Sequence, residues 1–474
     1  MYTKNTKIVC TLGPASNTVK NITNLIQAGM NVARLNFSHG DYESHAKLIK
    51  NIHKAEKITG HRIAILQDLQ GPKIRVGEMP NDGINVEKDQ IITLTIRKII
   101  GIEKDGKVTI PVKYKGIIKD VKAGDSVLIN DGLIETKAEK IGTNSISCKV
   151  KFGGKVTSGN GVNLPNSSVT IATITEKDKK DLKFGLEHHV DFVALSFVKS
   201  AKDIKDLRAM INKFGKNVKI VAKIERHEAI KNLKEIIQAT DAVMVARGDL
   251  GTDIPAEQVP IVQKRMIALS NSLGKPVITA TQVLQSMIKN PRATRAEISD
   301  AANAVFDHTD AIMLSNETAV GKYPIKATAT LTKVAYSVEK ELQNHKELQE
   351  YVFNKHYMSP INASCLNACE MAMDSNAALI AVYTEDGYTA NHIAKHRIYT
   401  PIMVFTPHAK TARQLTLTWG INHVIVKKLA EDNNQKINEI KKLLQKEKFA
   451  KKGNKIIVVC NASRKESIIS TITL

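Results

Sequence analysis

Eight short apolar segments recur along the first three-quarters of the chain, and a helical pattern lies after each of them. The apolar segments occupy residues 7–12, 31–37, 63–68, 191–198, 218–225, 242–246, 276–281 and 311–315. The helical patterns occupy residues 17–28, 41–56, 176–187, 200–213, 227–237, 257–272, 294–306 and 324–340. Strands that alternate with helices eight times in series are typical of a (β/α)8 TIM barrel, with parallel strands inside and helices outside. The repeat therefore predicts an α/β protein built on such a barrel.

Two further regions interrupt or follow this repeat. Between residues 72 and 170, Gly-rich and alternating segments such as QIITLTI and DSVLIND predict a small β-barrel domain inserted after the third strand. Loops after the strands of a TIM barrel lie at its C-terminal face, so this domain is expected to cover the barrel mouth as a lid. Three strand patterns after residue 342 predict an open α/β sheet. The expected domains are a barrel of 1–71 and 171–341, a lid of 72–170 and a C-terminal domain of 342–474.

The composition limits the classes of function. The chain carries 69 Lys and Arg against 47 Asp and Glu, a formal net charge of +22, and its lysines are spread along the whole length. A solvated surface explains dispersed lysines first, and a general attraction for phosphorylated small molecules explains them second. Nucleic-acid binding would favour clustered Arg and aromatic residues, and the chain has one Trp. The sequence also contains no apolar run of membrane-spanning length and no signal-peptide pattern, which predicts a cytoplasmic protein without membrane contact.

Charged and hydroxyl-bearing residues follow most of the predicted barrel strands. The C-terminal ends of these strands meet at one face of the barrel, where the active site of such a fold lies. Each residue alone has a structural explanation, such as an ion pair or a helix cap, but their common position predicts one site. The residues are Arg34, Asn36, Ser38, His39, Asp68, Lys73, Arg75, Lys223, Glu225, Arg247, Gly248, Asp249, Thr279, Thr281, Ser315 and Glu317.

The types of these residues indicate phosphoryl transfer. Glu225 and Asp249 offer the hard oxygen ligands that suit Mg²⁺ or Mn²⁺. Arg34 and Arg75 offer forked donors to phosphate, and Lys223 offers a point charge. A metal ion, guanidinium groups and an ammonium group around an anion together stabilise a transferring phosphoryl group.

Nine long motifs follow one another along the chain. They are TLGPAS at 11–16, GMNVARLNFSHG at 29–40, DLQGPKIRVGE at 68–78, GVNLPNSS at 161–168, VAKIERHEAI at 221–230, VMVARGDLGTDIP at 243–255, ITATQVLQSM at 278–287, NPRATRAEISDAANAVFD at 290–307 and MLSNETAVGKYP at 313–324. In this order they resemble the pyruvate kinase family over essentially the whole chain. The resemblance implies transfer of a phosphoryl group from phosphoenolpyruvate to ADP, which gives pyruvate and ATP in the last step of glycolysis. It also implies a Mg²⁺-dependent cytoplasmic homotetramer.

The resemblance further implies roles for the residues at the barrel mouth. Lys223, Arg34 and Thr281 would be catalytic, with Lys223 stabilising the transferring phosphoryl group and the enolate. The carboxylate of the substrate would lie against Gly248, Asp249 and Thr281, and Mg²⁺ would bind to Glu225 and Asp249. The residues expected beside the nucleotide phosphates are Asn36, Phe37, Ser38, His39 and Arg75.

Lys73 and Leu69 bear on the monovalent cation. Members of the family that require K⁺ resemble one another in carrying Glu at the position of Lys73 and Thr at the position of Leu69. A lysine brings its own positive charge to this neighbourhood, and a leucine removes an oxygen ligand. We therefore expect activity without K⁺, with Asn36, Ser38 and Asp68 as remnants of the cation site.

Several positions depart from the family pattern. Asn160 stands where the family carries a lysine that helps with the nucleotide, and Asn166 and Asn316 stand where it carries glycines. Glu385 and Asp386 occupy the loop that holds an effector phosphate in the family. The two carboxylates would repel the phosphate groups of an effector, so we expect weak or absent activation by fructose 1,6-bisphosphate.

Two other functions stay open at this point. A non-catalytic paralogue could bind phosphorylated metabolites without turnover, but it would be expected to have lost a charge at the mouth, and Arg34, Lys223, Glu225 and Asp249 are all present. Another phosphoenolpyruvate-using barrel enzyme is the second alternative. The insertion after the third strand argues against it.

Overall fold

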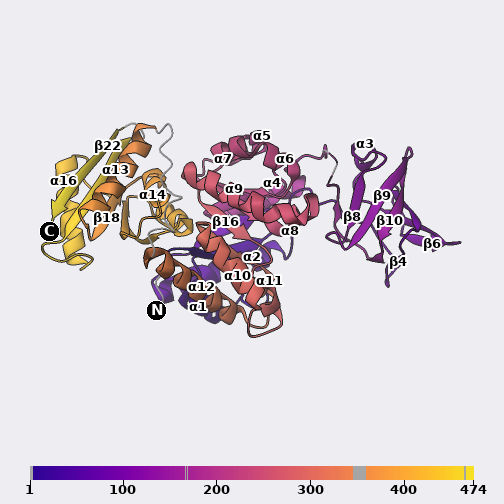
Figure 1. Cartoon of the computed structure of the whole chain (residues 1–474), viewed down its shortest axis with the longest axis horizontal. Helices are drawn as coiled ribbons and strands as arrows, with labels where there is room; N and C mark the ends of the chain where they lie inside the picture. The colour runs from indigo at the N-terminus through magenta and orange to yellow at the C-terminus, as the bar shows by residue number, and fades with distance from the viewer. Residues whose placement is uncertain (1–3, 166, 168, 345–358, 464–465) are drawn as a thin grey trace.

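Three bodies lie in a row along the molecule (Figure 1). The computed structural model describes residues 4–165, 167, 169–344, 359–463 and 466–474. A closed barrel lies in the middle, a β-domain on one side of it, and an open sheet with helices on the other. The predicted fold class is confirmed, while the predicted domain boundaries stay a prediction.

The central body is a closed barrel of eight parallel strands. Both faces of these strands are buried, because the barrel interior covers one face and the helical layer covers the other. This double burial explains why the strands are continuous apolar runs rather than alternating patterns. All eight predicted strands are confirmed. They are β1 (Lys7–Thr11), β2 (Val32–Asn36), β3 (Ala64–Asp68), β13 (Phe192–Leu195), β14 (Lys219–Ile224), β15 (Ala242–Ala246), β16 (Val277–Ala280) and β17 (Ala311–Leu314).

Helices surround the barrel as the repeat predicts. The expected helix at 227–237 is divided at Asn232 into two, and two short helices after β15 and β17 were not expected. Side-chain oxygens cap several N-termini, and Thr18, Asp41, Thr175 and Thr294 each accept a hydrogen bond from the first turn. The helices are α1 (Val19–Ala28), α2 (Tyr42–Thr59), α4 (Glu176–Glu187), α5 (Ala201–Lys213), α6 (His227–Lys231), α7 (Leu233–Ala239), α8 (Arg247–Asp253), α9 (Val259–Ser272), α10 (Arg295–Phe306), α11 (Asn316–Ala319) and α12 (Pro324–Asn344).

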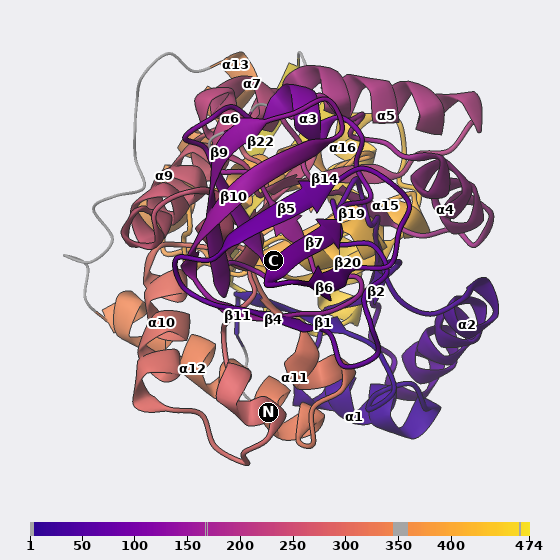
Figure 2. The same ribbon diagram turned by 90° about the vertical axis from the view of Figure 1, so that its right-hand side faces the viewer.

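The inserted domain leaves after β3 and has a hydrophobic core of its own. Its strands form a two-stranded sheet and an open seven-stranded sheet, and the short strands β12 and β6 lie at the edges of the larger one. Figure 2 shows the sheet in front of the barrel and its ring of helices, as expected for a lid. The elements are β4 (Ile84–Val86), β5 (Ile91–Thr95), β6 (Ile102–Lys104), β7 (Lys107–Pro111), α3 (Ile117–Asp120), β8 (Ser126–Ile129), β9 (Ile134–Ile141), β10 (Ser145–Phe152), β11 (Gly154–Val156) and β12 (Val162–Asn163).

The C-terminal sheet has five strands, of which three were predicted. The elements are α13 (Pro360–Asp374), β18 (Leu379–Tyr383), α14 (Tyr388–Ala394), β19 (Ile402–Thr406), α15 (Ala409–Gln414), β20 (Ile421–Val426), α16 (Asn433–Lys446), β21 (Lys455–Ser463) and β22 (Glu466–Thr473). The Lys-rich helix α16 buries one face at Lys436, Ile440 and Leu444. Among the helices in the described ranges, none has the length and apolar character that a membrane span requires.

The C-terminal sheet docks at the end of the barrel opposite the lid. Lys7 at the start of β1 donates to the carbonyl oxygen of Ile421 at 2.8 Å and to Oδ1 of Asn422 at 2.6 Å. Asp310, just before β17, pairs with Arg397 at 2.9 Å, and both side chains are buried. The starts of the barrel strands therefore carry the domain contact, and their ends are left for the lid.

Asp191, just before β13, generates a prediction about pH and stability. Its Oδ2 accepts from the Ile65 N–H at 2.9 Å, and burial raises its pKa to about 7 against the opposing effects of that hydrogen bond and of Arg413. The folded chain therefore binds this proton more tightly than the unfolded chain, so stability is lost as pH rises from about 4 to about 7. We expect Asp191→Asn to escape this loss and to gain several degrees in Tm over wild type at pH 8, with little gain at pH 4.5.

Thermal unfolding at both pH values measures the effect. Asp82→Asn in an exposed turn of the lid is the control and should leave Tm unchanged at either pH. A gain from Asp191→Asn that does not depend on pH would contradict the assignment.

Candidate active site

The predicted residues meet at the C-terminal end of the barrel, under the lid. A cavity of about 1060 Å³ opens beside them and extends along α9 and α10, and the predicted residues that line it are Lys73, Arg247, Gly248 and Asp249. Barrel and lid both contribute to its wall, with Gly248, Asp249 and Gln282 from the barrel and Asp131 from the lid. A site of this size, lined by charged groups, can hold polar substrates between the two bodies.

Lys223 and Glu225 lie at the end of β14, where strand alternation directs both side chains to the same side. The Lys223 Nζ is 2.9 Å from Glu225 Oε1 and 3.2 Å from Asp68 Oδ1, and it donates to Ser196 Oγ at 2.7 Å. One ammonium, about 12% of whose side chain is exposed, therefore lies between two buried carboxylates that come from different strands.

Asp68 joins this ammonium to Arg34. The Arg34 Nε and Nη2 atoms each lie 2.7 Å from Asp68 Oδ2, and Nη1 donates to Thr11 Oγ1 at 2.9 Å. Burial alone would raise the pKa of the Asp68 carboxyl, but the charges of Lys223 and Arg34 outweigh it and hold the pKa below the ordinary value. The sequence predicted Asp68 as a strand-end residue of the site and as a remnant of a cation site, and the structure places it between two cationic side chains, Arg34 and Lys223.

The pKa values of Lys223 and Glu225 are both raised, for different reasons. Burial opposes the charge on Lys223, but Asp68 and Glu225 outweigh burial and raise its pKa above the usual range, so its ammonium stays charged at neutral pH. Burial also raises the pKa of Glu225, Lys223 opposes this rise, and the nearby charge of Asp249 adds to it. Glu225 is buried and Asp249 is partly exposed, and a carboxylate whose pKa is raised by burial and by a second carboxylate belongs to a donor set that a divalent cation would stabilise. Glu225 and Asp249 therefore fit Mg²⁺.

Lys73 lies between the barrel and the lid. Its Nζ is 3.7 Å from Oδ1 of Asp249 in the barrel and 3.5 Å from Oδ1 of Asp131 in the lid. Asp131 was not predicted, because it lies in the loop between β8 and β9 and only the fold brings it to the mouth. Lys73 thus places a positive charge beside the predicted metal ligand. Leu69 is buried and offers the site no oxygen from its side chain.

Thr281 and Gln282 form a strained turn after β16, with φ values of 67° and 51°. The Thr281 Oγ1 accepts from the Gly248 N–H at 2.8 Å and donates to the Ala280 carbonyl oxygen at 2.6 Å. Arg247 stabilises the turn from outside: its Nη2 donates to the carbonyl oxygens of Thr281 at 2.7 Å and Gln282 at 3.0 Å. The sequence placed Arg247 at a strand end but did not identify this supporting contact.

The loop after β2 carries the residues expected beside a nucleotide. Oδ1 of Asn36 accepts from the Ser38 N–H at 3.1 Å, and His39 is exposed. Phe37 is buried, its ring stacks on His45 with centroids 4.1 Å apart, and its backbone N–H and carbonyl oxygen bond to Asp68 and Lys177, so the loop is fixed to the core. Arg75 on the lid side donates to the Gly159 carbonyl oxygen at 2.9 Å.

Two residues of the strand-end set, Thr279 and Glu317, have structural roles. The Thr279 hydroxyl is fully buried and lies 3.0 Å from the hydroxyl of Thr309, a residue that comes just before β17. Glu317 is also buried, and its two oxygens accept from the N–H groups of Leu284 at 3.2 Å and Ser315 at 2.7 Å. Glu317 therefore joins α11 to the loop after β16.

A further cluster among the described residues has the composition of a metal site. Ligand atoms of His227, Glu228 and Asp253 lie within 4.8 Å of one another. His227 Nδ1 is 2.8 Å from Asp253 Oδ2, and Arg226 Nε donates to Glu228 Oε2 at 2.8 Å. The guanidinium already compensates these carboxylates, so we assign no metal to them.

The departures from the family pattern also have locations. The Asn160 Oδ1 accepts from the Thr157 N–H at 2.7 Å and so closes a lid turn, and Asn316 begins α11. Asp386 Oδ1 accepts from the Tyr388 N–H at 2.9 Å, while Glu385 is exposed. Asn166 lies outside the described residues.

Asp68 generates a prediction about stability. Asp68→Asn would leave Arg34 and Lys223 close together without the carboxylate between them. Breaking a buried ion pair in this way costs about 3 kcal/mol or more of unfolding free energy, which urea unfolding measures. Asp206→Asn, which breaks the exposed pair of Asp206 with Lys202, is the control and should cost less than about 1 kcal/mol. Equal costs for the two variants would show that Asp68 does not bridge the cations.

Comparisons with known proteins show which family this chain resembles along its length. Residues 3–328 match the family described as pyruvate kinase, barrel domain, and residues 362–471 match pyruvate kinase, alpha/beta domain. Pyruvate kinase 2 of Synechocystis sp. is 42% identical over 459 residues, which is 96% of this chain and 76% of that protein. Pyruvate kinase of Staphylococcus saprophyticus is 45% identical over 425 residues, 89% of this chain and 72% of that one. A crystal structure of a pyruvate kinase from Cryptosporidium parvum superposes with a TM-score of 0.90 at 36% identity, covering 99% of this chain and 96% of the other.

Proposed function

The chain belongs to the pyruvate kinase family, and on that premise we propose that it transfers the phosphoryl group of phosphoenolpyruvate to ADP in a Mg²⁺-dependent reaction. The products are pyruvate and ATP, and the reaction is the last step of glycolysis. We also propose that the enzyme works in the cytoplasm as a homotetramer. The resemblance along the whole chain supports these finer statements.

Lys223 carries the proposal. Its ammonium lies between the buried carboxylates of Asp68 and Glu225 at the mouth of the barrel. A positive charge that is fixed before the reaction stabilises the negative charge that develops on the transferring phosphoryl group and then on the enolate. Arg34 is held by Asp68 and Thr11, and its remaining N–H groups would bind phosphate oxygens.

The other residues of the site bind and orient. Glu225 and Asp249 would hold Mg²⁺, which supplies charge neutralisation for the phosphate and carboxylate oxygens when bound. The carboxylate of phosphoenolpyruvate would lie against Gly248, Asp249 and Thr281. The nucleotide phosphates would lie against Arg75 and the loop of residues 36–39. Holding both substrates in line removes much of the entropic cost of a loose phosphoryl transfer.

Protonation of the enolate carbon completes the reaction. Thr281 is the proposed source, acting through a chain of water molecules because a hydroxyl alone is a weak acid. Its position is set by the Gly248 N–H and by Arg247, which holds the carbonyl oxygen of Thr281. The strained turn therefore keeps the hydroxyl at the mouth of the barrel.

A coupled assay of pyruvate formation tests the function directly. Wild-type protein with phosphoenolpyruvate, ADP and Mg²⁺ should form pyruvate, and Lys223→Met should lose on the order of 10³-fold in kcat while keeping its fold, because the preorganised charge is gone. Circular dichroism and Tm check the fold of the variant. Near-wild-type turnover by Lys223→Met would remove the proposed mechanism.

Metal dependence gives a separate prediction. Asp249→Asn should raise the half-saturating Mg²⁺ concentration about tenfold or more, since a neutral amide is a poorer ligand for a hard cation. Asp131→Asn is the matched control, because Asp131 is the other carboxylate near Lys73 and is not a proposed ligand. An unchanged Mg²⁺ titration for Asp249→Asn would exclude this residue from the metal site.

We propose that the activity does not require K⁺, and Lys73 and Leu69 support this proposal. The ammonium of Lys73 beside Asp249 supplies a positive charge at the mouth, and Leu69 is buried and apolar. Activity in tetramethylammonium buffer should therefore be full, and adding KCl at constant ionic strength should change it little. The double variant Lys73→Glu with Leu69→Thr should acquire activation by KCl. Strong activation of the wild-type enzyme by KCl would rule the idea out.

A further inference from the structure

We propose that Lys199 and Arg226 are positioning residues that clamp the lid to the barrel and, through Phe197, set the orientation of the Glu225 carboxylate. The inference rests on the proposed function only for the role of Glu225 as a metal ligand. The clamp itself stands on contacts that are independent of the chemistry.

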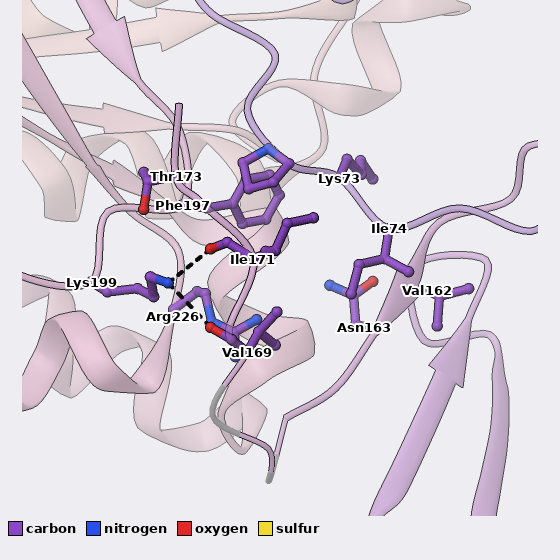
Figure 3. A pocket seen from close by; sticks show the side chains of 11 residues that line it. Lys73, Ile74, Val162, Asn163, Val169, Ile171, Thr173, Phe197, Lys199 and Arg226 are labelled. Carbon is purple, nitrogen blue, oxygen red and sulfur yellow. Dashed lines mark hydrogen bonds between the residues drawn. The ribbon is translucent and has the colours of Figure 1, made fainter. Parts of the chain in front are cut away.

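The chain passes from the barrel to the lid between β3 and β4, which we call the outgoing crossing. It returns between β12 and α4, which we call the return crossing, and Lys199 and Arg226 bind this second segment. The Lys199 Nζ donates to the carbonyl oxygens of Val169 at 3.1 Å and Ile171 at 3.0 Å, as the dashed lines in Figure 3 show. Arg226 Nη2 donates to the carbonyl oxygen of Ser167 at 3.0 Å. Three carbonyl oxygens of the return crossing, at alternate positions, are thus held by two charged groups of the barrel.

The clamp is rigid at its barrel end. The Lys199 N–H donates to Asp203 Oδ2 at 2.9 Å, which fixes the residue at the start of α5. Arg226 is buried, and its guanidinium is anchored by Glu228 at 2.8 Å, with Asp253 3.9 Å away. These two carboxylates belong to the cluster that has the composition of a metal site. Their role here is to orient a guanidinium toward the lid.

The clamp also has a lid end. The Ser167 hydroxyl donates to Asp125 Oδ2 at 3.0 Å, and Asp125 lies just before β8 in the large sheet. Arg226 therefore reaches the sheet of the lid through one intervening residue. A displacement of the sheet would be transmitted to the guanidinium, and a fixed guanidinium limits that displacement.

Phe197 connects the two crossings, which together form the hinge between barrel and lid, to the proposed metal ligand Glu225. Its N–H donates to Glu225 Oε2 at 2.7 Å, and its backbone has the left-handed φ of 56°, which non-glycine residues adopt only when their surroundings require it. Its side chain lies in the hinge: a Cβ on Gly71 of the outgoing crossing would be 3.0 Å from the Phe197 Cδ2. Glu225 is thus bracketed by Phe197 in space and by Arg226 in the chain.

A small cavity at this place gives the hinge room to move. It has a volume of about 30 Å³, near that of one water molecule, and it is too small for a substrate. Its wall comes from both crossings and from the barrel, and includes Pro72, Val169, Ile171, Phe197, Lys199 and Arg226 (Figure 3). Loss of either cation would let the return crossing shift into this space, and Phe197 would shift with it.

Lid position and metal affinity test the proposal together. All five native cysteines are buried, so a cysteine introduced at Lys104 on the lid and another at Lys54 on α2 can be labelled selectively for energy transfer. We expect Lys199→Met to broaden the lid-to-barrel distance distribution without substrates present. We also expect kcat about tenfold lower and half-saturating Mg²⁺ about tenfold higher, since small misplacements of a ligand have effects of this size.

Three further variants make the test specific. Lys199→Arg keeps donors for both carbonyl oxygens and should restore both readouts to within about threefold of wild type. Lys202→Met, in the first turn of α5 just after Lys199 and in an exposed pair with Asp206, should change neither. Arg226→Lys keeps the charge but loses the fork that reaches Ser167 and Glu228 together, so it should change both readouts even if Lys199→Met fails to fold.

The outcomes separate the clamp from the proposed function. A distance distribution and a Mg²⁺ titration that stay at wild-type values in Lys199→Met and Arg226→Lys would overturn the proposal. A lower Tm in these variants with no change in Mg²⁺ dependence would also overturn it, because that result indicates a purely structural role. Failure of the wild-type enzyme to form pyruvate would refute the proposed function, while the distance measurement would still decide the clamp.

Discussion

The carboxylate of Asp68 between Arg34 and Lys223 is the interaction on which the rest of the site depends. Without it two buried cations would repel each other at the place where an anionic substrate must be bound. The barrel supplies this carboxylate only because β3 pairs with β13 across the whole lid insertion, with Asp68 opposite Ala194. The charge cluster is therefore complete only when β3 and β13 have paired in the closed barrel.

The barrel could be predicted from the sequence because its strands are buried on both faces and appear as continuous apolar runs. The short helices α8 and α11 could not, since each has too few residues for a helical period to be recognised. Strand β22, ESIISTIT, carries mixed polar residues at the edge of the C-terminal sheet and is defined by its antiparallel pairing with β21. It follows β21 directly along the chain, but its mixed polar residues form no continuous apolar run.

The active site was predictable to the level of strand ends and no further. Lys223 and Glu225 alternate along one strand, so their common direction follows from strand geometry. Thr281 lies at the mouth and Thr279 in the core, and this difference depends on a turn in which Thr281 has a positive φ. A threonine in the sequence does not predict such a backbone conformation. Asp131 and Lys199 act through loops that meet only when the lid is in place, and their contacts could not be read from spacing.

The pairing of β1 with β17 also has a consequence for biosynthesis. Lys7 of β1 lies opposite Ala311, so the first strand made by the ribosome must wait for the last barrel strand before its second edge is covered. The lid, which has its own core, can collapse while that edge is still open. Unpaired edges and long-range closure make a nascent chain slow to fold and prone to aggregation. The order in which this barrel is connected therefore leaves an unpaired strand edge open until the last barrel strand has been made.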